Sequence, residues 1–255
     1  ASFFGLLKAG GVFCLGNPLV HQPDIEYLLL YTGARAVIAD VETLDRLLPA
    51  LAGNSRCRVR LVVGAGDRDL PEGFERFEQV LASSSSETDN ADTHRDDVAG
   101  WLFTSGTTGK PKGAVHFHHH FPFNTECYPK RVLCLREDDV FVSVSRLFFG
   151  YATGTNLMFP FAVGGCAVLF PDRPTKERIF EHVERYGVTV LTNVPAMIRQ
   201  MVDAEPVPRM STLRMCLSAG EALPPALHAR WQASWPDCEL LDGIGSAEMF
   251  HIYIS

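Results

Sequence analysis

The chain of 255 residues is 46% hydrophobic and 21% charged, an ordinary globular composition that can build one large or two modest cores. Its formal net charge of −7 argues against nucleic acid as a main partner, because binding through counterion release requires basic patches. No apolar run approaches the about 20 residues that span a bilayer, so we expect no membrane partner either.

Seven cysteines form no Cys-x-x-Cys pair and no evident disulfide framework. We therefore expect reduced, buried thiols in a cytoplasmic protein. The sequence leaves the oligomeric state open.

Short β-rich runs alternate with longer helical patterns, which is typical of βα units with largely parallel sheets. The predicted strands are residues 11–15, 36–39, 60–63, 99–103, 140–144, 167–170, 188–191, 215–218 and 239–241. The predicted helices are residues 23–31, 41–51, 175–186, 194–203 and 224–234. Thr175 suits the N-cap of the third helix, and Pro224 or Pro225 suits the first turn of the last. The fold class is therefore α/β, with mostly parallel sheets flanked by helices.

The polar segment 82–92 reads as a loop, and we expect the next strand to return to the sheet of the preceding strands. We place the division of the chain near the charged run 136–139, which gives lobes of residues 1–135 and 136–255. Open α/β sheets tend to bind ligands where they meet, so we expect a nucleotide site between the lobes.

The segment FTSGTTGKPKG, residues 103–113, has the composition that a polyphosphate site requires. Its glycines let backbone N–H groups form a nest around an anion, its hydroxyls add donors, and Lys110 and Lys112 add positive charge. It follows an apolar run, as a phosphate loop at the end of a strand does. It is not a Walker loop, because Pro111 follows Lys110 where that motif has Ser or Thr. The alternative is a flexible surface loop rich in small polar residues.

This loop resembles the signature motif of the adenylate-forming superfamily, which contains acyl-CoA synthetases, nonribosomal peptide adenylation domains and luciferases. Further segments resemble motifs of that family in the same order: residues 7–13 with 17–19, residues 218–224 and residues 242–248. Within the superfamily, LFFGY at 147–151 and EMFHI at 248–252 are similar to benzoate and substituted-benzoate CoA ligases. Neither segment aims an acidic side chain at an ammonium group, so aromatic acids are favoured over amino acids.

The resemblance implies a set of nucleotide-binding residues. Those expected at the phosphates are Thr104, Ser105, Gly106, Thr107, Thr108, Gly109 and Lys112, and those expected around the adenine and AMP are Gly220, Glu221, Asp242, Gly243, Ile244 and Ala247. Thr104 and Lys112 would act in catalysis together with Glu248, which would bind Mg²⁺. The alternative for Glu248 is a solvated acid at a helix start.

The resemblance also implies an acyl pocket. Its expected residues are Phe149, Tyr151, Ala219, Gly220, Gly245, His251 and Ile252. Aromatic side chains offer edge or offset contacts to an aryl acid, and His251 is a candidate to hydrogen-bond the carboxylate or a ring substituent. The alternative is that these side chains are plain core.

Position 247 departs from the family pattern, which has Thr there with its hydroxyl towards the AMP phosphate. Ala247 lacks that donor, at a cost of about 1.5–3 kcal/mol, or roughly tenfold to a hundredfold in a step that uses it. The neighbouring hydroxyl of Ser246 is the candidate replacement.

The histidines at 116, 118, 119 and 120 resemble a metal-ligand pattern, because His116 and His120 would share one face of a helix. No nearby Glu or Cys completes a zinc set, so we do not expect metal binding there.

Family members continue through a ribose-binding Asp, a hinge and a small C-terminal domain with a catalytic Lys, and none of these motifs occurs here. We therefore expect a partial N-terminal domain, with the C-terminal domain absent, that is inactive or impaired alone. The resemblance implies that the parent enzyme uses ATP, Mg²⁺ and CoA to convert an aromatic carboxylate to an aryl-AMP and then to an aryl-CoA thioester. Two alternatives stay open: an aryl adenylation domain that loads a carrier protein, and a non-catalytic nucleotide-binding scaffold.

Overall fold

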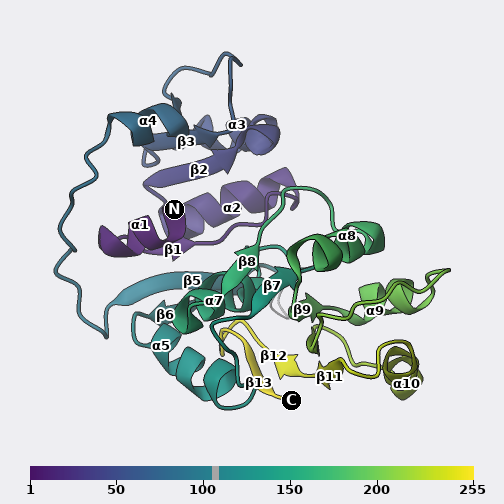
Figure 1. Cartoon of the computed structure of the whole chain (residues 1–255). Helices are drawn as coiled ribbons and strands as arrows, with labels where there is room; N and C mark the ends of the chain where they lie inside the picture. Colours follow the sequence, from purple (N-terminus) through teal and green to yellow (C-terminus); the bar gives the residue numbers. More distant parts are fainter. Residues whose placement is uncertain (105–108) are drawn as a thin grey trace. The chain divides into compact units, whose positions relative to one another are not determined.

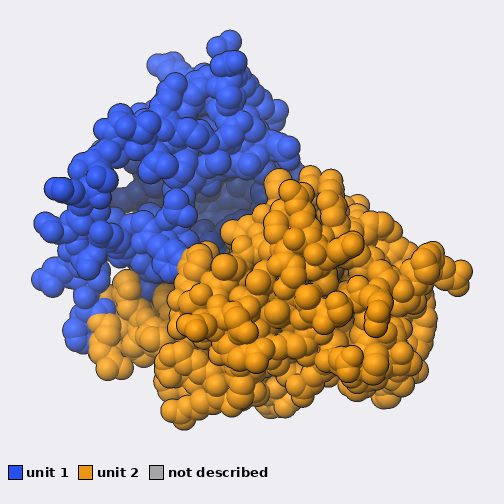
Figure 2. Space-filling view, viewed as in Figure 1, with its two compact units in different colours: residues 1–94, 99–101, 105–112 blue, residues 95–98, 102–104, 113–255 orange. Residues whose placement is uncertain are grey.

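The computed structural model describes residues 1–104 and 109–255, and the chain divides into two compact units (Figures 1 and 2). Unit 1 contains residues 1–94 and 99–101 with the described part of 105–112, and unit 2 contains residues 95–98, 102–104 and 113–255. The chain passes between the units within strand β5, Val98–Thr104, and again at the start of β6, Lys112–Phe117. The predicted lobes of 1–135 and 136–255 do not coincide with these units, and as a functional division they stay a prediction.

Unit 1 contains a three-stranded parallel sheet in the order β2-β3-β4. Its strands are β2 Ala36–Asp40, β3 Val59–Val63 and β4 Glu75–Arg76, and its helices are α1 Ser2–Lys8, α2 Gln22–Thr32, the 3-10 turn η1 Val41–Thr43, α3 Leu44–Leu51 and α4 Phe77–Ser83. Helix α3 buries Leu44, Leu47 and Leu51, which lie on one helical face, against the sheet and its loops. A further short strand, β1 Phe13–Cys14, pairs in parallel with β5.

Unit 2 contains a five-stranded parallel sheet in the order β11-β10-β9-β7-β8. The strands are β7 Val140–Ser143, β8 Cys166–Val168, β9 Val190–Asn193, β10 Met215–Ser218 and β11 Glu239–Asp242. One helix connects each of the last strands to the next: α8 Lys176–Tyr186 lies between β8 and β9, α9 Pro195–Val202 between β9 and β10, and α10 Pro225–Ser234 between β10 and β11. Before β8 the chain forms α5 His120–Thr125, the π-helical turn η2 Glu126–Lys130, α6 Gly150–Thr153, a second π-helical turn η3 Gly154–Met158, and α7 Phe159–Val163. The antiparallel hairpin β12 Ile244–Gly245 and β13 Ile252–Ile254 follows β11.

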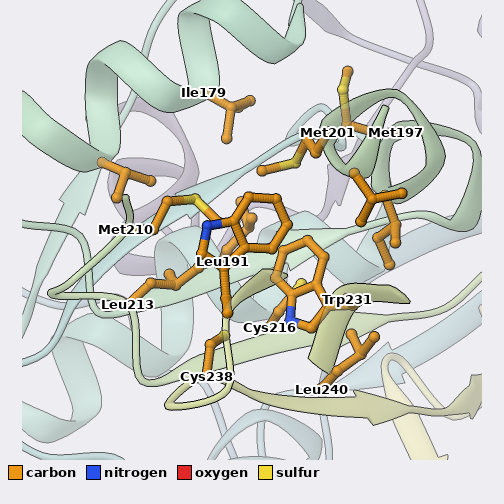
Figure 3. Close-up of a cluster of buried hydrophobic side chains, with 14 of the residues drawn as sticks. Ile179, Leu191, Met197, Met201, Met210, Leu213, Cys216, Trp231, Cys238 and Leu240 are labelled. Carbon is orange, nitrogen blue, oxygen red and sulfur yellow. The ribbon is translucent and has the colours of Figure 1, made fainter. Parts of the chain in front are cut away.

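Both faces of this parallel sheet are buried, because neighbouring residues of a strand point to opposite faces and helices cover each side. The face covered by α8, α9 and α10 contributes Val142, Leu191, Cys216 and Leu240 to the core cluster around Trp231 (Figure 3). The opposite face contributes Phe141, Val190, Met215 and Leu217 to a second cluster with Phe159 of α7. The interior of each strand is therefore used mainly for packing, and apart from the buried Thr192 of β9 the polar residues lie at the strand ends.

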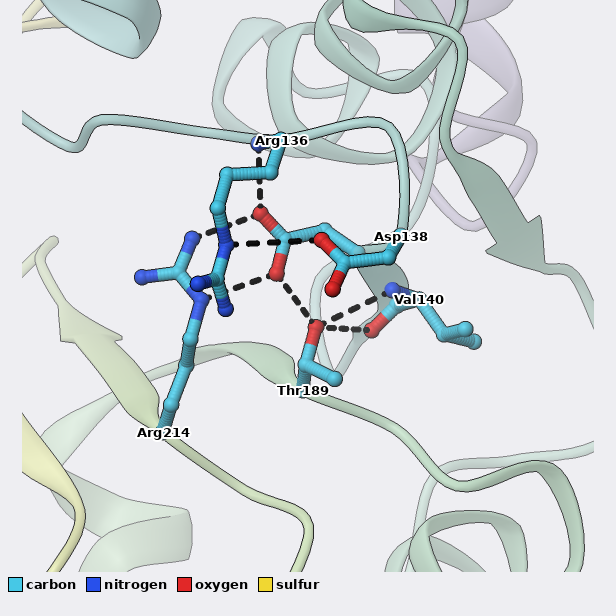
Figure 4. A network of polar contacts seen from close by, with 6 residues as sticks. Arg136, Asp138, Val140, Thr189 and Arg214 are labelled. Carbon is cyan, nitrogen blue, oxygen red and sulfur yellow. Dashed lines mark hydrogen bonds and ion pairs between the residues drawn. The ribbon is translucent and has the colours of Figure 1, made fainter.

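A buried carboxylate holds the amino ends of three neighbouring strands together (Figure 4). Asp139, just before β7, accepts hydrogen bonds from Arg214 Nε at 2.8 Å and from the other guanidinium arm at 2.6 Å. It also accepts from the Thr189 hydroxyl at 2.7 Å and the Arg136 N–H at 2.8 Å. Thr189 precedes β9 and Arg214 precedes β10, so one side chain fixes all three strand starts. Burial alone would raise the pKa of Asp139, but the hydrogen bonds from Arg214, Thr189 and the Arg136 N–H outweigh it and lower the pKa.

Most elements predicted from the sequence are present with small shifts of their ends. Thr175 caps α8 by accepting from the Arg178 N–H at 3.3 Å, and Pro225 is the first residue of α10, both as predicted. The strand predicted at 11–15 is reduced to two residues, and the one predicted at 188–191 starts at Val190, because residue 189 belongs to the polar network. The sequence missed β6, the two-residue or three-residue strands β4, β12 and β13, and the short helices α1, α4, α5, α6 and α7. The helices have at most seven residues, which is too short to display a clear helical period.

The expectation of buried thiols is wrong for four cysteines, namely Cys14, Cys127, Cys134 and Cys166, which are exposed. The other three cysteines are buried, and all seven are free thiols. Among the helices of the described residues, none combines the length and apolar character that a membrane crossing requires.

We predict that Arg214→Leu destabilises unit 2 at neutral pH, because it leaves the fully buried Asp139 carboxylate without a cation. The expected loss is about 3 kcal/mol, the lower end of the range for breaking a buried ion pair, since Arg214 keeps 26% of its side chain exposed. The folded-state pKa of Asp139 is lowered, so its stabilisation is present above the unfolded pKa of about 4 and is lost as the pH falls through the folded value.

The difference in unfolding free energy between the natural chain and the Arg214→Leu variant should therefore shrink on acidification, as Asp139 becomes protonated in the folded state of each protein. Denaturant unfolding at neutral and acidic pH measures this difference. A gap that stays constant with pH would show that Arg214 stabilises through packing of its stem and not through the carboxylate.

Candidate functional site

The phosphate-loop prediction falls partly outside the described residues: Ser105, Gly106, Thr107 and Thr108 lie there. Of the remaining predicted residues, Thr104 is the half-buried last residue of β5, and Lys112 is the exposed first residue of β6. Gly109 has a positive φ of 85°, a conformation that a loop of this kind needs and that few other residues adopt. The strand that the sequence predicted before the loop is therefore present as β5, whereas the strand after the loop, β6, was not predicted.

The end of the phosphate loop is tied to helix α2 within unit 1. The Tyr27 hydroxyl donates to the Pro111 carbonyl at 3.1 Å, and the Lys110 ammonium lies over the Tyr27 ring, 5.2 Å from its centroid. A cation over an aromatic face contributes about 0.5–1 kcal/mol at an exposed site. Sequence reasoning missed Tyr27, because one Tyr in an apolar helical pattern looks like core.

The carboxyl ends of β10 and β11 form the second part of the site, within unit 2. The Gly243 N–H donates to the Ser218 carbonyl at 2.8 Å, and the Asp242 carboxylate accepts from the Leu223 N–H at 3.3 Å. These bonds tie the 219–224 loop to the end of β11, where parallel sheets bind ligands. Gly220 has φ +95°, and a Cβ added there would meet open space, so a flat group could approach its backbone. Glu221 is exposed beside it.

The glycines of the β12-β13 hairpin have a structural reason to be glycine. A Cβ on Gly245 would lie 2.7 Å from the His251 carbonyl, and one on Gly243 would lie 2.8 Å from the Ile252 side chain. The close pairing of β13 therefore excludes larger residues without any ligand. Ile244 between them is exposed, and ligand-binding roles for these three residues stay predictions.

Four of the predicted acyl-pocket residues lie together in unit 2. Ala219 and Ile252 are buried in one cluster against which the Tyr151 ring packs, and the rings of Tyr151 and His251 lie 5.3 Å apart. The Tyr151 hydroxyl donates to the Asn193 carbonyl at 3.3 Å, at the carboxyl end of β9. Burial raises the pKa of Tyr151 well above its usual value, so the phenol stays neutral. Phe149 is outside this cluster: it is 52% exposed and packs on Phe148.

The state of His251 follows from its surroundings. It is 2% exposed, and burial lowers its pKa to about 3, so the imidazole is neutral. Its Nε2 lies 3.1 Å from the Tyr151 carbonyl, which can only accept, so Nε2 carries the proton. Nδ1 is then an acceptor, and it has no hydrogen-bond partner among the described residues. Of the two predicted roles, a bond to a ring hydroxyl or amino group fits this acceptor and a bond to a carboxylate does not.

Glu248 lies in a tight turn between the strands of the hairpin. The Ala247 carbonyl accepts from the Phe250 N–H at 3.2 Å, which closes the turn, and from His116 Nε2 at 2.8 Å. The Ser246 hydroxyl accepts from the Met249 N–H at 3.3 Å and keeps its own proton available to a ligand. The Glu248 carboxylate is exposed at the first central position of the turn.

The residues around Glu248 suit a magnesium ion only if a bound substrate supplies further oxygen ligands. No group of three or more His, Cys, Asp or Glu side chains within residues 1–104 and 109–255 is arranged to hold a metal ion. Mg²⁺ is commonly bound through one or two carboxylates, with phosphate oxygens and waters completing its octahedron. Glu248 alone therefore suits an ion that arrives with a nucleotide.

The histidine run does not form the predicted helical face. His116 is on strand β6, and His120 begins helix α5, although their rings lie 5.5 Å apart. His119 Nδ1 is 3.0 Å from the Asp96 carboxylate and 3.0 Å from the Arg95 carbonyl. The run thus makes contacts within the protein, and His116 makes its main one to the turn of Glu248.

The family model for AMP-binding enzymes matches residues 1–255. The chain is 39% identical to the benzoate–CoA ligase of Thauera aromatica, covering 100% of this chain and 47% of the relative. It is 34% identical to the 4-hydroxybenzoate–CoA/benzoate–CoA ligase of Rhodopseudomonas palustris, covering 99% and 46%. The chain thus spans about half the length of the curated relatives it matches.

Two solved structures share the fold. A benzoate CoA ligase from Burkholderia xenovorans LB400 superposes with a TM-score of 0.88 at 36% identity, over 99% of this chain and 49% of that one. An anthranilate CoA ligase in complex with anthranoyl-AMP superposes with a TM-score of 0.92 at 31% identity, over 99% and 48%. The predicted α/β class and the resemblance drawn from the motifs are both confirmed. The chain belongs to the AMP-binding enzyme family and has the fold of the adenylate-forming enzymes.

Proposed function

We propose that the intact protein is an ATP-dependent aryl-carboxylate:CoA ligase. An aromatic carboxylate oxygen attacks the α-phosphorus of ATP and pyrophosphate leaves, which gives an aryl-AMP. The CoA thiol then attacks the acyl carbon, AMP leaves, and the thiol proton passes to solvent. The observation that carries the proposal is the aromatic-walled cluster of Tyr151, His251, Ala219 and Ile252, which adjoins the open strand exit at Gly220. The names of relatives that match the whole chain, benzoate–CoA and anthranilate–CoA ligases, support the same class.

Each part of the chain has a role in this proposal. Thr104, Lys112 and the loop between them would bind the phosphates, and Gly220, Glu221 and Asp242 would border the adenine. Tyr151 and His251 would orient the ring by edge contacts and by the free acceptor Nδ1. Glu248 would hold Mg²⁺, which neutralises the charge that develops on the phosphates. We place the enzyme in the cytoplasm, because its seven free thiols and its co-substrates suit a reducing compartment.

A second candidate differs only in the acceptor. The p-hydroxybenzoic acid–AMP ligase of Mycobacterium tuberculosis is 28% identical over 98% of this chain, and its name specifies an AMP product without CoA. An enzyme of that kind would carry out the first step and deliver the acyl group to another thiol, such as that of a carrier protein. A non-catalytic scaffold is favoured by Ala247 alone.

The test begins with benzoate-dependent exchange of pyrophosphate into ATP by the intact protein, followed by product analysis with CoA and with a carrier protein. We expect exchange with aryl acids and not with amino acids, and a CoA thioester as product. Exchange without a thioester would favour the second candidate. No exchange with any aryl acid would favour the scaffold.

A binding measurement tests the adenylate site independently of catalytic turnover. Calorimetry with a non-hydrolysable benzoyl-adenylate mimic should show binding to the natural chain and a large loss for Lys112→Ala. We expect the 255 residues by themselves to bind nucleotide weakly and to turn over slowly or not at all. Rapid thioester formation by these residues alone would contradict that expectation.

We predict that Glu248→Gln raises the Mg²⁺ concentration needed for half-maximal adenylation by about tenfold to a hundredfold, because an amide is a weaker ligand for a hard cation. A Mg²⁺ titration of pyrophosphate exchange measures the shift. Glu239→Gln, an exposed acid on β11, is the matched control and should leave the titration unchanged. Equal curves for both variants would remove Glu248 from the metal site.

We predict that Ala247→Thr increases the adenylation rate by about tenfold to a hundredfold, because it supplies a hydroxyl donor to a phosphate that carries charge. Ala247→Val has nearly the same shape without the hydroxyl and should give no gain. Single-turnover formation of aryl-AMP measures both rates. A gain shared by both variants would indicate packing, and no gain in either would indicate that another donor, such as Ser246, already does this.

A further inference from the structure

We propose that His116 is a positioning residue: its Nε2–H bond to the Ala247 carbonyl holds the turn that presents Glu248. The role of Glu248 rests on the proposed function, whereas the effect of His116 on the turn does not. The bond joins residues 131 positions apart, at 2.8 Å, within one compact unit. It links β6, the strand that follows the phosphate loop, to the segment of residues 242–248.

The turn needs an anchor because its own geometry is strained. Phe250 has a positive φ of 69°, which is rare for a bulky side chain and strains the backbone. Within the turn, the Phe250 N–H bond to the Ala247 carbonyl is the closing contact. Ala247 has no polar side chain, so a neighbour can hold this residue only through its backbone, and the carbonyl is the group that His116 contacts. His116 uses the second lone pair of that oxygen.

His116 is itself held rigidly. It is 1% exposed, its ring meets the Phe250 ring edge-on at 5.3 Å, and the Phe121 ring lies 6.4 Å away. The rings of Phe121 and Phe250 also meet edge-on, with their centroids 5.2 Å apart. The donor therefore cannot swing away from the carbonyl without opening this aromatic group.

The proton on His116 is assigned by the same geometry. A carbonyl only accepts, so Nε2 carries the proton, and Nδ1 faces Nδ1 of His120 at 3.4 Å. His120 Nδ1 also lies 3.3 Å from the Phe117 N–H, so it either donates to His116 or accepts from the backbone. Both arrangements leave the bond to Ala247 intact. The bond to the turn is thus independent of how the histidine pair shares its protons.

Two substitutions separate the donor from the bulk of the ring. His116→Leu fills much of the same space without a donor, whereas His116→Gln places an amide N–H near the position of Nε2. We expect hydrogen exchange of the backbone in residues 245–252 of the intact protein to rise by about fivefold to tenfold in His116→Leu and to stay near the natural rate in His116→Gln. Equal exchange in the two variants would overturn the proposal, because bulk alone would then explain the site.

His120→Leu is the control for the histidine pair. It removes the partner of His116 Nδ1 and leaves the Ala247 contact in place. We expect natural exchange rates in residues 245–252 for this variant. Exchange as fast as in His116→Leu would show that the pair, and not the bond to Ala247, fixes the turn, and would also overturn the proposal.

The kinetic experiment tests the consequence for the reaction. In a Mg²⁺ titration of pyrophosphate exchange, His116→Leu should raise the half-saturating Mg²⁺ concentration about fivefold to tenfold with little change in the rate at saturating Mg²⁺, and His116→Gln should restore it. If the natural protein shows no exchange with any aryl acid, the proposed function fails, and hydrogen exchange still decides the role of His116. If the natural protein is active and His116→Leu has a natural Mg²⁺ dependence, the positioning role fails while the function stands.

A spectroscopic measurement covers the case in which His116→Leu does not fold. In natural protein with ¹⁵N-labelled histidine, the His116 ring should be the Nε2–H tautomer with a slowly exchanging proton. An Nδ1–H tautomer cannot donate to Ala247 and would overturn the proposal.

Discussion

The arrangement of strands in unit 2 depends on the hydrogen bonds that the Asp139 carboxylate accepts, because these bonds join the starts of three adjacent strands. Thr189 and Arg214 reach it from the positions that precede β9 and β10, and Asp139 itself precedes β7. Parallel strands have no hairpin to set their register, so contacts between strand ends add to the register that the buried faces specify. A buried charge with four hydrogen-bond donors is suited to this, since a shift of one residue would leave it unpaired.

Fixing the amino ends leaves the carboxyl ends free for chemistry. The strand interiors pack on both faces, so side chains that can meet a ligand have to come from the residues where the strands stop. Asn193, Ala219 and Asp242 are at or next to these positions, and each is engaged by a neighbouring loop or helix. The stabilising polar network and the unit 2 part of the candidate site therefore lie at opposite ends of the strands of one sheet, and substitutions at one end should leave the other largely unaffected.

The sequence predicted the buried strands and the long amphipathic helices because these carry their own signal, an apolar run or a 3.6-residue period. It also revealed the segments that carry the family resemblance, since the residues of each segment are contiguous. It could not predict contacts whose partners are far away along the chain: Tyr27 meets Pro111 across 84 positions, and His116 meets Ala247 across 131. The tautomer of His251 could not be predicted from the sequence either, because the carbonyl of Tyr151 on α6, 100 positions away, determines which nitrogen keeps the proton.

The departure at position 247 is easier to understand once the turn is seen to depend on main-chain groups. Its closing bond and its bond to His116 both end on the carbonyl of residue 247, which every amino acid provides. The Ser246 hydroxyl contributes one more bond, to the Met249 N–H. A Thr or an Ala at 247 can therefore occupy the same turn, and Glu248 keeps its place in either case. Under the proposed function, the substitution would change the donors offered to a phosphate without changing the turn, so loss of this hydroxyl is no argument against a nucleotide site here.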